Sequence, residues 1–439
     1  MKVGPYDHFS LPDGSKAPLY ILQFDAAGRS TSPLTIDHLI AELRAHEFTE
    51  TYFFSHGWNN TFSDAVGLYK QFFSEYLDLR AKRNLPNGKG YRPVFIGTHW
   101  PSIALVLPWE RGPQIASEEK STDEDDEQAR AMIGLVLGEN VADQFYELTE
   151  RESLTGEEAQ ELGGILRRFY SDVAEGSTAA PEIDQIVGAW HDLAAARKDS
   201  APDYDAPPGT FASSGTVAPE AAVSIKEVLD PRSALRVTTV LMMKDRAGFV
   251  GSLGVAHVLT RILEASESPV RLIGHSYGCR VMLTAVSVPQ GLPRKIDSML
   301  LLQAAVNRYC FAVLIPDLGV RGGFAVVPER VNRPIISTFS RDDAPLRYLF
   351  QFAARRLKDL GELRAAASEP SIYAALGGYG AAGMIGGNYR ELPIQDVGVP
   401  YPRFEGLRVL GVDGSGKITG HGDIRNQYVG WALLDQVTH

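Results

Sequence analysis

Cysteine is scarce in this chain, whose 439 residues include only Cys279 and Cys310. Two thiols cannot form the disulfide framework of a small secreted protein, and so low a number favours a reducing compartment. The first residues contain no apolar stretch of signal-peptide length, and the longest apolar run, 311–315, is too short to cross a bilayer. The sequence therefore predicts a cytoplasmic protein without a transmembrane segment, although export without a cleaved signal stays open.

Positive charge is also in deficit, since 43 Lys and Arg stand against 54 Asp and Glu, for a formal net charge of −11. This balance, with no basic patch motif, argues against nucleic acid as a partner. The acidic run 118–127 lacks a spaced ligand set and is expected to be a solvated loop. Gly248, Gly251 and Gly254 fit neither the dinucleotide fingerprint nor a P-loop. We expect no metal and no organic cofactor, and the sequence indicates no oligomeric state.

What the chain does have is apolar runs that alternate with helical patterns. The runs expected to be strands lie at 19–24, 51–55, 93–98, 270–273, 298–303, 334–339 and 407–411. Helical spacing lies between several of these runs, at 35–46, 63–82, 256–263 and 279–286. Strands that are apolar on both faces and separated by helices predict an α/β fold, with a mostly parallel central sheet and helices on both faces.

The alternation breaks between the third and fourth predicted strands. Helical patterns follow there, at 129–137, 141–148 and 157–169, and then a stretch at 202–219 that is rich in Ala, Pro, Ser and Gly. We therefore expect a core formed by 1–110 and 236–439, with a mostly helical insertion over 111–235.

The strongest local signal is Gly274-His275-Ser276-Tyr277-Gly278, between a predicted strand and a predicted helix. A G-x-S-x-G turn in that context is a nucleophile elbow, in which the serine hydroxyl projects at the carboxyl end of the sheet. The flanking glycines suit a tight turn, because a side chain there would collide with the neighbouring strand or helix. Ser276 is therefore the candidate nucleophile, and the alternative is a plain turn.

A serine nucleophile needs a base, and the base needs an orienting acid. Of the ten histidines, His421 follows the last predicted strand on a glycine-flanked loop and fits the chain order serine, acid, histidine. His56 comes too early in that order, and His275 is expected to point away from the serine hydroxyl. We therefore expect His421 to be the base.

Two adjacent aspartates, Asp342 and Asp343, follow the strand predicted at 334–339. Asp343 is favoured as the acid, because its offset from the serine at the strand end fits an S-x-x-D arrangement. Asp342 stays open as the alternative, and the unused aspartate is expected to cap the next helix.

Acyl transfer builds negative charge on a carbonyl oxygen, so the third requirement is an oxyanion hole. One donor is expected to be the backbone N–H of Tyr277, the residue after the nucleophile. The other is expected from the loop after an early strand, where Trp58 follows His56 and Gly57. Gly57 lets the backbone turn its amides towards a substrate, and His56 is expected to be structural.

Taken together, these motifs resemble those of the α/β-hydrolases. More narrowly, the chain is similar to bacterial serine hydrolases of the esterase and lipase type, through the segments 56–60, 98–102, 244–248 and 420–424. The resemblance covers the sheet domain, about two-thirds of the chain. It implies an α/β-hydrolase fold, a triad of Ser276, Asp343 and His421, and an insertion that forms a lid. The implied substrate is a small-molecule or lipid acyl ester.

The resemblance leaves the cleaved bond open, because one fold hosts many chemistries. A thioesterase and a peptidase or amidase need the same triad as an esterase. A binding protein on a catalytically silent hydrolase fold is a different class, and the presence of serine, acid and histidine in order argues against it.

Overall fold

The computed structural model describes residues 3–83, 90–102, 139–149, 151, 154–171, 183, 187, 243–316, 319–343, 345–350 and 374–438. The chain divides into two compact units. Unit 1 comprises Met1–Ser102, Met243–Gln351 and Pro370–His439, and unit 2 comprises Ile103–Met242 and Phe352–Glu369. The predicted insertion, 111–235, falls within unit 2, and its role as a lid stays a prediction. The acidic run and the patterns at 129–137 and 202–219 lie outside the described residues.

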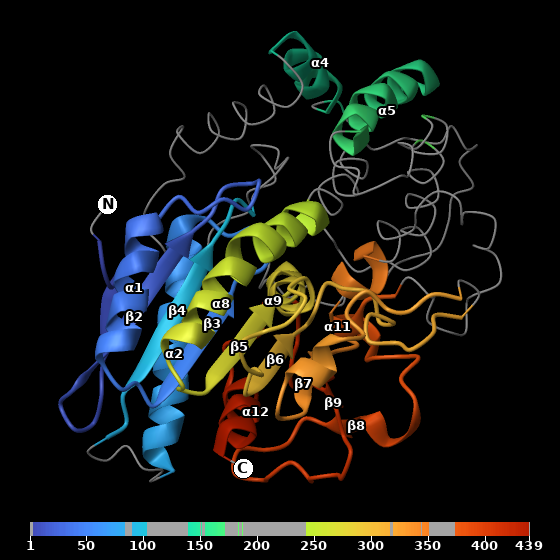
Figure 1. Cartoon of the computed structure of the whole chain (residues 1–439). Helices are drawn as coiled ribbons and strands as arrows, with labels where there is room; N and C mark the ends of the chain where they lie inside the picture. Colours follow the sequence, from blue (N-terminus) through green and yellow to red (C-terminus); the bar gives the residue numbers. More distant parts are fainter. Residues whose placement is uncertain are drawn as a thin grey trace, which may run out of the picture. The chain divides into compact units, whose positions relative to one another are not determined.

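Unit 1 has an α/β fold built on a nine-stranded sheet with the strand order β1-β2-β4-β3-β5-β6-β7-β9-β8 (Figure 1). Its strands are β1 (Asp7–Ser10), β2 (Lys16–Gln23), β3 (Glu50–Ser55), β4 (Pro93–His99), β5 (Val270–His275), β6 (Ser298–Leu302), β7 (Ile335–Phe339), β8 (Tyr389–Pro393) and β9 (Val409–Asp413). β1, at one edge, runs antiparallel to β2, and the other neighbouring pairs are parallel. The predicted α/β class with a mostly parallel sheet is confirmed.

Helices cover both faces of this sheet. α2 (Phe62–Lys82) and α12 (Gln427–Thr438) pack on one face, against alternate strand residues such as Tyr52 and Phe54. α1 (Pro33–Ala45), α8 (Ala256–Ala265) and α9 (Tyr277–Ser287) lie on the other face (Figure 1). β3 and β5 are buried along their whole length, which is why their sequences are apolar on both faces.

A π-helical turn, η2 (Val250–Val255), leads into α8. Its glycines allow close packing: a side chain at Gly251 would meet the Val281 carbonyl at 2.6 Å, and one at Gly254 would meet the Phe24 ring at 2.5 Å. Close approach to α9 and to the segment after β2 therefore accounts for these glycines.

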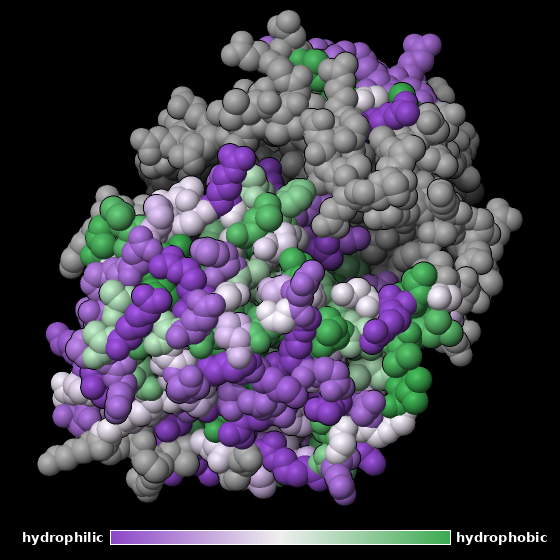
Figure 2. Space-filling model, in the orientation of Figure 1, coloured by the Kyte–Doolittle hydropathy of each residue, from purple (hydrophilic) through white to green (hydrophobic). Residues whose placement is uncertain are grey.

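Short helical turns complete unit 1: η3 (Val327–Arg330), η4 (Pro345–Leu349), α11 (Leu376–Tyr379) and η6 (Gly386–Asn388). The face of unit 1 seen in Figure 2 is mostly hydrophilic, with smaller apolar areas. Exposed apolar side chains include Val313, Leu314, Val320 and Ile385.

In unit 2 the described residues include two helices, α4 (Glu139–Thr149) and α5 (Gly156–Ser171), close to the patterns at 141–148 and 157–169. A capping box begins α5, because the Thr155 N–H donates to the Glu158 carboxylate (2.8 Å) and the Glu158 N–H donates to the Thr155 hydroxyl (3.3 Å). Buried apolar side chains of the two helices include Phe145, Leu148, Leu162 and Leu166.

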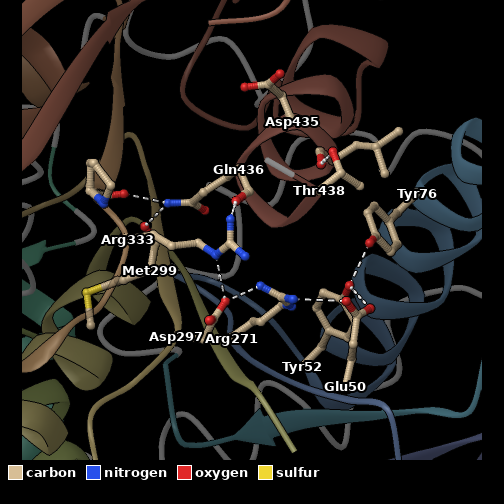
Figure 3. A network of polar contacts seen from close by, with 12 residues as sticks. Glu50, Tyr52, Tyr76, Arg271, Asp297, Met299, Arg333, Asp435, Gln436 and Thr438 are labelled. Carbon is tan, nitrogen blue, oxygen red and sulfur yellow. Dashed lines mark hydrogen bonds and ion pairs between the residues drawn. The ribbon is translucent and has the colours of Figure 1, made fainter. Parts of the chain in front are cut away.

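A buried ionic network joins the amino ends of the central strands (Figure 3). Arg271 on β5, whose side chain is 4% exposed, binds Glu50 of β3 (Nη2–Oε1 2.9 Å) and Asp297, just before β6. Arg333, just before β7, also binds Asp297 (Nε–Oδ2 3.0 Å) and donates to the Gln436 carbonyl of α12 (3.1 Å). Through Arg333, the network thereby connects the amino ends of β6 and β7 to α12.

The network extends to α2 through two tyrosines. The Tyr52 hydroxyl donates to Glu50 (2.5 Å) and lies 2.5 Å from the Tyr76 hydroxyl of α2. Burial raises the pKa of Tyr76 to about 12, with Glu50 adding to the effect, so both hydroxyls stay protonated at neutral pH. The neutral Tyr52 hydroxyl thus donates to the Glu50 carboxylate, and the Tyr76 hydroxyl connects Tyr52 to α2.

The change Arg271→Met should lower the free energy of unfolding by about 3–5 kcal/mol, because it leaves the Glu50 and Asp297 carboxylates without their shared partner. Arg408→Met is the matched control, since Arg408 and Glu329 form an exposed pair (3.4 Å), and such pairs contribute about 0–1 kcal/mol. Urea denaturation measures both losses. If the two variants lost equal free energy of unfolding, the buried ion pairs of Arg271 would not stabilise the fold more than an exposed pair does.

Candidate active site

The carboxyl ends of the parallel strands meet at one edge of the sheet, where open α/β sheets bind ligands. Segments that leave this edge include 56–60 after β3, 100–102 after β4, 276 after β5, 303–306 after β6, 340–343 after β7 and 414–421 after β9. Every side chain predicted for the site lies on one of these segments or directly after it.

Ser276 occupies the sharp turn between β5 and α9. Its backbone has φ 54° and ψ −122°. Residues other than glycine rarely adopt a positive φ. The backbone is held on both sides: its N–H donates to the Leu302 carbonyl (3.0 Å), and its carbonyl accepts from the Ala305 N–H (3.1 Å). Such a conformation costs about 1–3 kcal/mol and persists only where the surroundings enforce it.

The two glycines of the elbow provide the necessary space. A side chain at Gly274 would meet the Cys279 Cα at 2.6 Å, and one at Gly278 would overlap the Ser55 carbonyl at the end of β3. Both obstacles are backbone atoms, which cannot move aside as a flexible side chain can. The spacing G-x-S-x-G is therefore a packing requirement in this structure.

Three polar side chains meet at this turn. His421 Nε2 lies 2.8 Å from Ser276 Oγ, and His421 Nδ1 lies 2.8 Å from Asp343 Oδ2. Ser276 and Asp343 are 2% and 0% exposed, whereas the His421 side chain is 22% exposed. A hydroxyl, an imidazole and a carboxylate in this order can move a proton from the serine to the histidine.

Of the two adjacent aspartates, Asp343 is the one that reaches His421. Asp343 Oδ1 also accepts from the Leu346 N–H (3.1 Å) at the start of the following helical turn. Asp342 is exposed, and its Oδ2 accepts from the Gly416 N–H (2.7 Å). The expectation that the unused aspartate would cap the next helix is therefore wrong, because Asp342 binds the loop after β9 instead.

The loop after β3 passes directly beside Ser276. A side chain at Gly57 would meet the Ser276 Cβ at 2.6 Å, so only glycine permits this approach. Trp58 follows, and its carbonyl accepts from the Asn60 side chain (2.8 Å). Tyr277 is the first residue of α9, and the amides of a helix's first turn point out of its amino end. The residues that carry the two predicted oxyanion donors thus directly follow Gly57 and Ser276 in the chain, and their role as donors stays a prediction.

His56, the first residue of this loop, is fully buried and makes structural contacts. Its Nδ1–H donates to the Gly57 carbonyl (2.8 Å), and its Nε2 accepts from the Trp100 N–H (3.4 Å). The imidazole also stacks on the Trp100 ring, with centroids 5.3 Å apart and planes 7° apart. Burial lowers the pKa of His56 to about 3, which fits a neutral ring with one donor and one acceptor nitrogen.

Two further side chains contact the loop that carries His421, and neither contact could be predicted from the sequence. His275 Nε2 lies 2.8 Å from the His421 carbonyl, and Gln303 Nε2 donates to the Gly420 carbonyl (3.2 Å). His275 lies within the elbow motif, and its position there was the signal available. Nothing in the sequence around Gln303 distinguishes it.

Within the described residues, no group of three or more His, Cys, Asp or Glu side chains is placed to hold a metal ion. Nor does any described helix have the length and apolar character needed to span a bilayer. A scan against protein-family models and searches of curated proteins and of solved structures find no match. The interpretation of the site therefore depends on its own geometry.

Two buried histidines should make the protein less stable in acid. In the folded state His56 and His275 have pKa values of about 3, against an ordinary 6.5. Below about pH 6.5 the unfolded chain therefore binds protons that the folded chain does not, and the free energy of unfolding falls as the pH decreases towards 3. The slope is up to about 1.4 kcal/mol per pH unit for each histidine.

Urea denaturation at neutral pH and at about pH 5 tests this dependence. His56→Gln should flatten the slope, because the amide does not titrate, and the same change at the exposed His257 should leave the slope as it is. A slope in His56→Gln equal to that of the wild type would contradict the prediction.

Proposed function

We propose that this chain is a serine hydrolase of the α/β-hydrolase type, which cleaves a small-molecule or lipid acyl ester through an acyl-enzyme intermediate. The observation that carries the proposal is the pair of 2.8 Å contacts that join Ser276 to His421 and His421 to Asp343. The turn between a strand and a helix, and the chain order serine, acid, histidine, support it further.

In the proposed mechanism, His421 Nε2 takes the proton from Ser276 Oγ as the oxygen attacks the carbonyl carbon. Asp343 accepts from the His421 Nδ1–H, which keeps Nε2 free of a proton before the attack and stabilises the imidazolium after it. His421 then protonates the leaving oxygen, and the leaving alcohol departs. A water molecule, activated by the same histidine, releases the acyl group from Ser276.

The developing oxyanion would be held by the backbone N–H groups of Trp58 and Tyr277. Such donors are effective because they are already oriented and do not reorganise during the reaction. The close contact of Gly57 with Ser276 supports this assignment, since it brings the start of the Trp58 loop against the nucleophile. Loss of one such donor costs about 3–4 kcal/mol in related chemistry.

The same serine, histidine and aspartate could also cleave substrates other than esters. A thioester or an amide would follow the same steps with a different leaving atom, so a thioesterase and a peptidase or amidase remain alternatives. Rates measured with matched ester, thioester and peptide substrates separate these three activities. A silent binding protein is disfavoured, because all three polar side chains are present and hydrogen-bonded in sequence.

Ser276→Ala should abolish covalent labelling by a fluorophosphonate probe, because the probe reacts with an activated serine oxygen. The exposed Ser10 offers a control, and Ser10→Ala should be labelled like the wild type. In-gel fluorescence and intact-protein mass measure the labelling. Unchanged labelling in Ser276→Ala would overturn the proposed function.

The adjacent aspartates give a second test. Asp343→Asn should lower the labelling rate by about 1,000-fold or more, because an amide favours the wrong imidazole tautomer. Asp342→Asn should lower it only a few-fold, since that side chain binds Gly416 in a neighbouring loop. Rates that fall equally in the two variants would refute the role proposed for Asp343.

A further inference from the structure

The side chain of His275 lies between the two loops that the proposed reaction uses. Its Nε2–H donates to the backbone carbonyl of His421 (2.8 Å), and the two imidazole rings lie 5.1 Å apart. On its other side, a side chain added at Gly57 would meet His275 Nδ1 at 3.1 Å. One buried ring therefore hydrogen-bonds to the base-bearing loop and lies close to the loop that leads to Trp58.

A second donor reinforces the first. Gln303 is 0% exposed, and its Nε2 donates to the Gly420 carbonyl (3.2 Å) and reaches the His421 carbonyl (3.5 Å). Its backbone adopts φ 38°, a left-handed conformation, and its N–H donates to the Thr338 hydroxyl (3.2 Å) of β7. Two consecutive carbonyls of the His421 loop thus bind side chains that leave the ends of β5 and β6.

The loop itself needs such anchors. His421 lies between Gly420 and Gly422, and glycine gives the backbone more freedom than any other residue. A side chain added at either glycine would meet nothing within 4 Å, so packing does not restrict the loop there. Productive placement of a catalytic group requires accuracy of about 0.5 Å. Hydrogen bonds to the backbone of the loop provide a restraint that packing does not.

We propose that His275 and Gln303 are positioning residues: they fix the backbone of His421 so that its imidazole lies against Ser276 Oγ. The inference rests on the proposed function, because it concerns the placement of the base in that reaction. Neither side chain contacts the serine oxygen in the described geometry, and both act through the main chain of the His421 loop.

The electrostatic surroundings keep His275 in the form that this role requires. Burial, with a smaller effect of His421, lowers the pKa of His275 to about 3, so the ring is neutral under ordinary conditions. The neighbouring groups that affect it, His421, His56 and Arg425, are all basic. A neutral ring that donates from Nε2 carries no proton on Nδ1, and it adds no charge beside the imidazolium that forms on His421.

The test compares two substitutions at position 275. His275→Leu removes the donor, and His275→Gln retains an N–H at a similar reach. His275→Leu should lower the rate of fluorophosphonate labelling by about 10- to 100-fold, because the His421 carbonyl loses a partner and the base loses its placement. With a chromogenic ester, kcat should fall by a similar factor while KM changes less than about threefold. His275→Gln should recover labelling to within about fivefold of the wild type.

His257→Leu, an exposed position on α8, is the control and should be labelled at the wild-type rate. Thermal unfolding of each variant identifies any loss of folded protein. If His275→Leu does not fold, Gln303→Met gives the same test by removing the second donor, with an expected loss of about 3- to 10-fold.

Two outcomes would overturn the inference: wild-type labelling in a folded His275→Leu, or labelling in His275→Gln as slow as in His275→Leu. A wild-type labelling rate in Gln303→Met would also overturn the inference. Failure of the proposed function is recognised separately, because Ser276 of the wild type would then not be labelled at all.

Discussion

The left-handed backbone of Ser276 is the constraint on which the rest of the site depends. It turns the chain from β5 into α9 so sharply that the hydroxyl leaves the sheet edge towards His421. Three neighbouring positions have no side chain, and each lies against backbone or against the serine itself: Gly274, Gly278 and Gly57. The cost of the conformation, about 1–3 kcal/mol, is offset by the burial of the strand that carries it.

β5 has this strained turn at its carboxyl end and buried ion pairs near its amino end. Arg271, near its start, is the centre of the ionic network that binds Glu50 and Asp297, and Ser276 follows its end directly. The network lies at the amino ends of the strands and the strained turn at their carboxyl ends. Buried contacts at the amino end of this short strand accompany its pairing with β3 and β6, and Ser276 follows directly at the other end.

The central strands and the helices between them could be predicted because continuous apolar runs need cover on both faces. Sequence patterns did not predict β1 and β8, since their residues alternate or are mostly exposed and both strands are short sheet edges. Nor did they predict α12, although its buried Val429 and Leu433 complete the core beside α2.

Within the candidate site, the serine and the histidine could be proposed from motif and chain order, whereas the contacts behind them could not. Asp342 and Asp343 are adjacent and chemically equal, and only their partners in distant segments, Gly416 and His421, distinguish them. The left-handed backbone of Gln303 has no local signal, because Gln rarely adopts it. His275 was expected only to point away from the hydroxyl, and its contact with the His421 carbonyl had no signal beyond its position in the elbow motif.

Three histidines lie close together at this edge of the sheet, and their surroundings give them different chemistry. His56 and His275 are buried, and desolvation keeps both neutral, so each can only donate from one nitrogen and accept at the other. His421 is partly exposed and has a carboxylate 2.8 Å from Nδ1. In the proposed reaction the proton of Ser276 would pass to His421, whose Nε2 lies 2.8 Å from the hydroxyl, while the two neutral rings bind the backbone of the loops on either side.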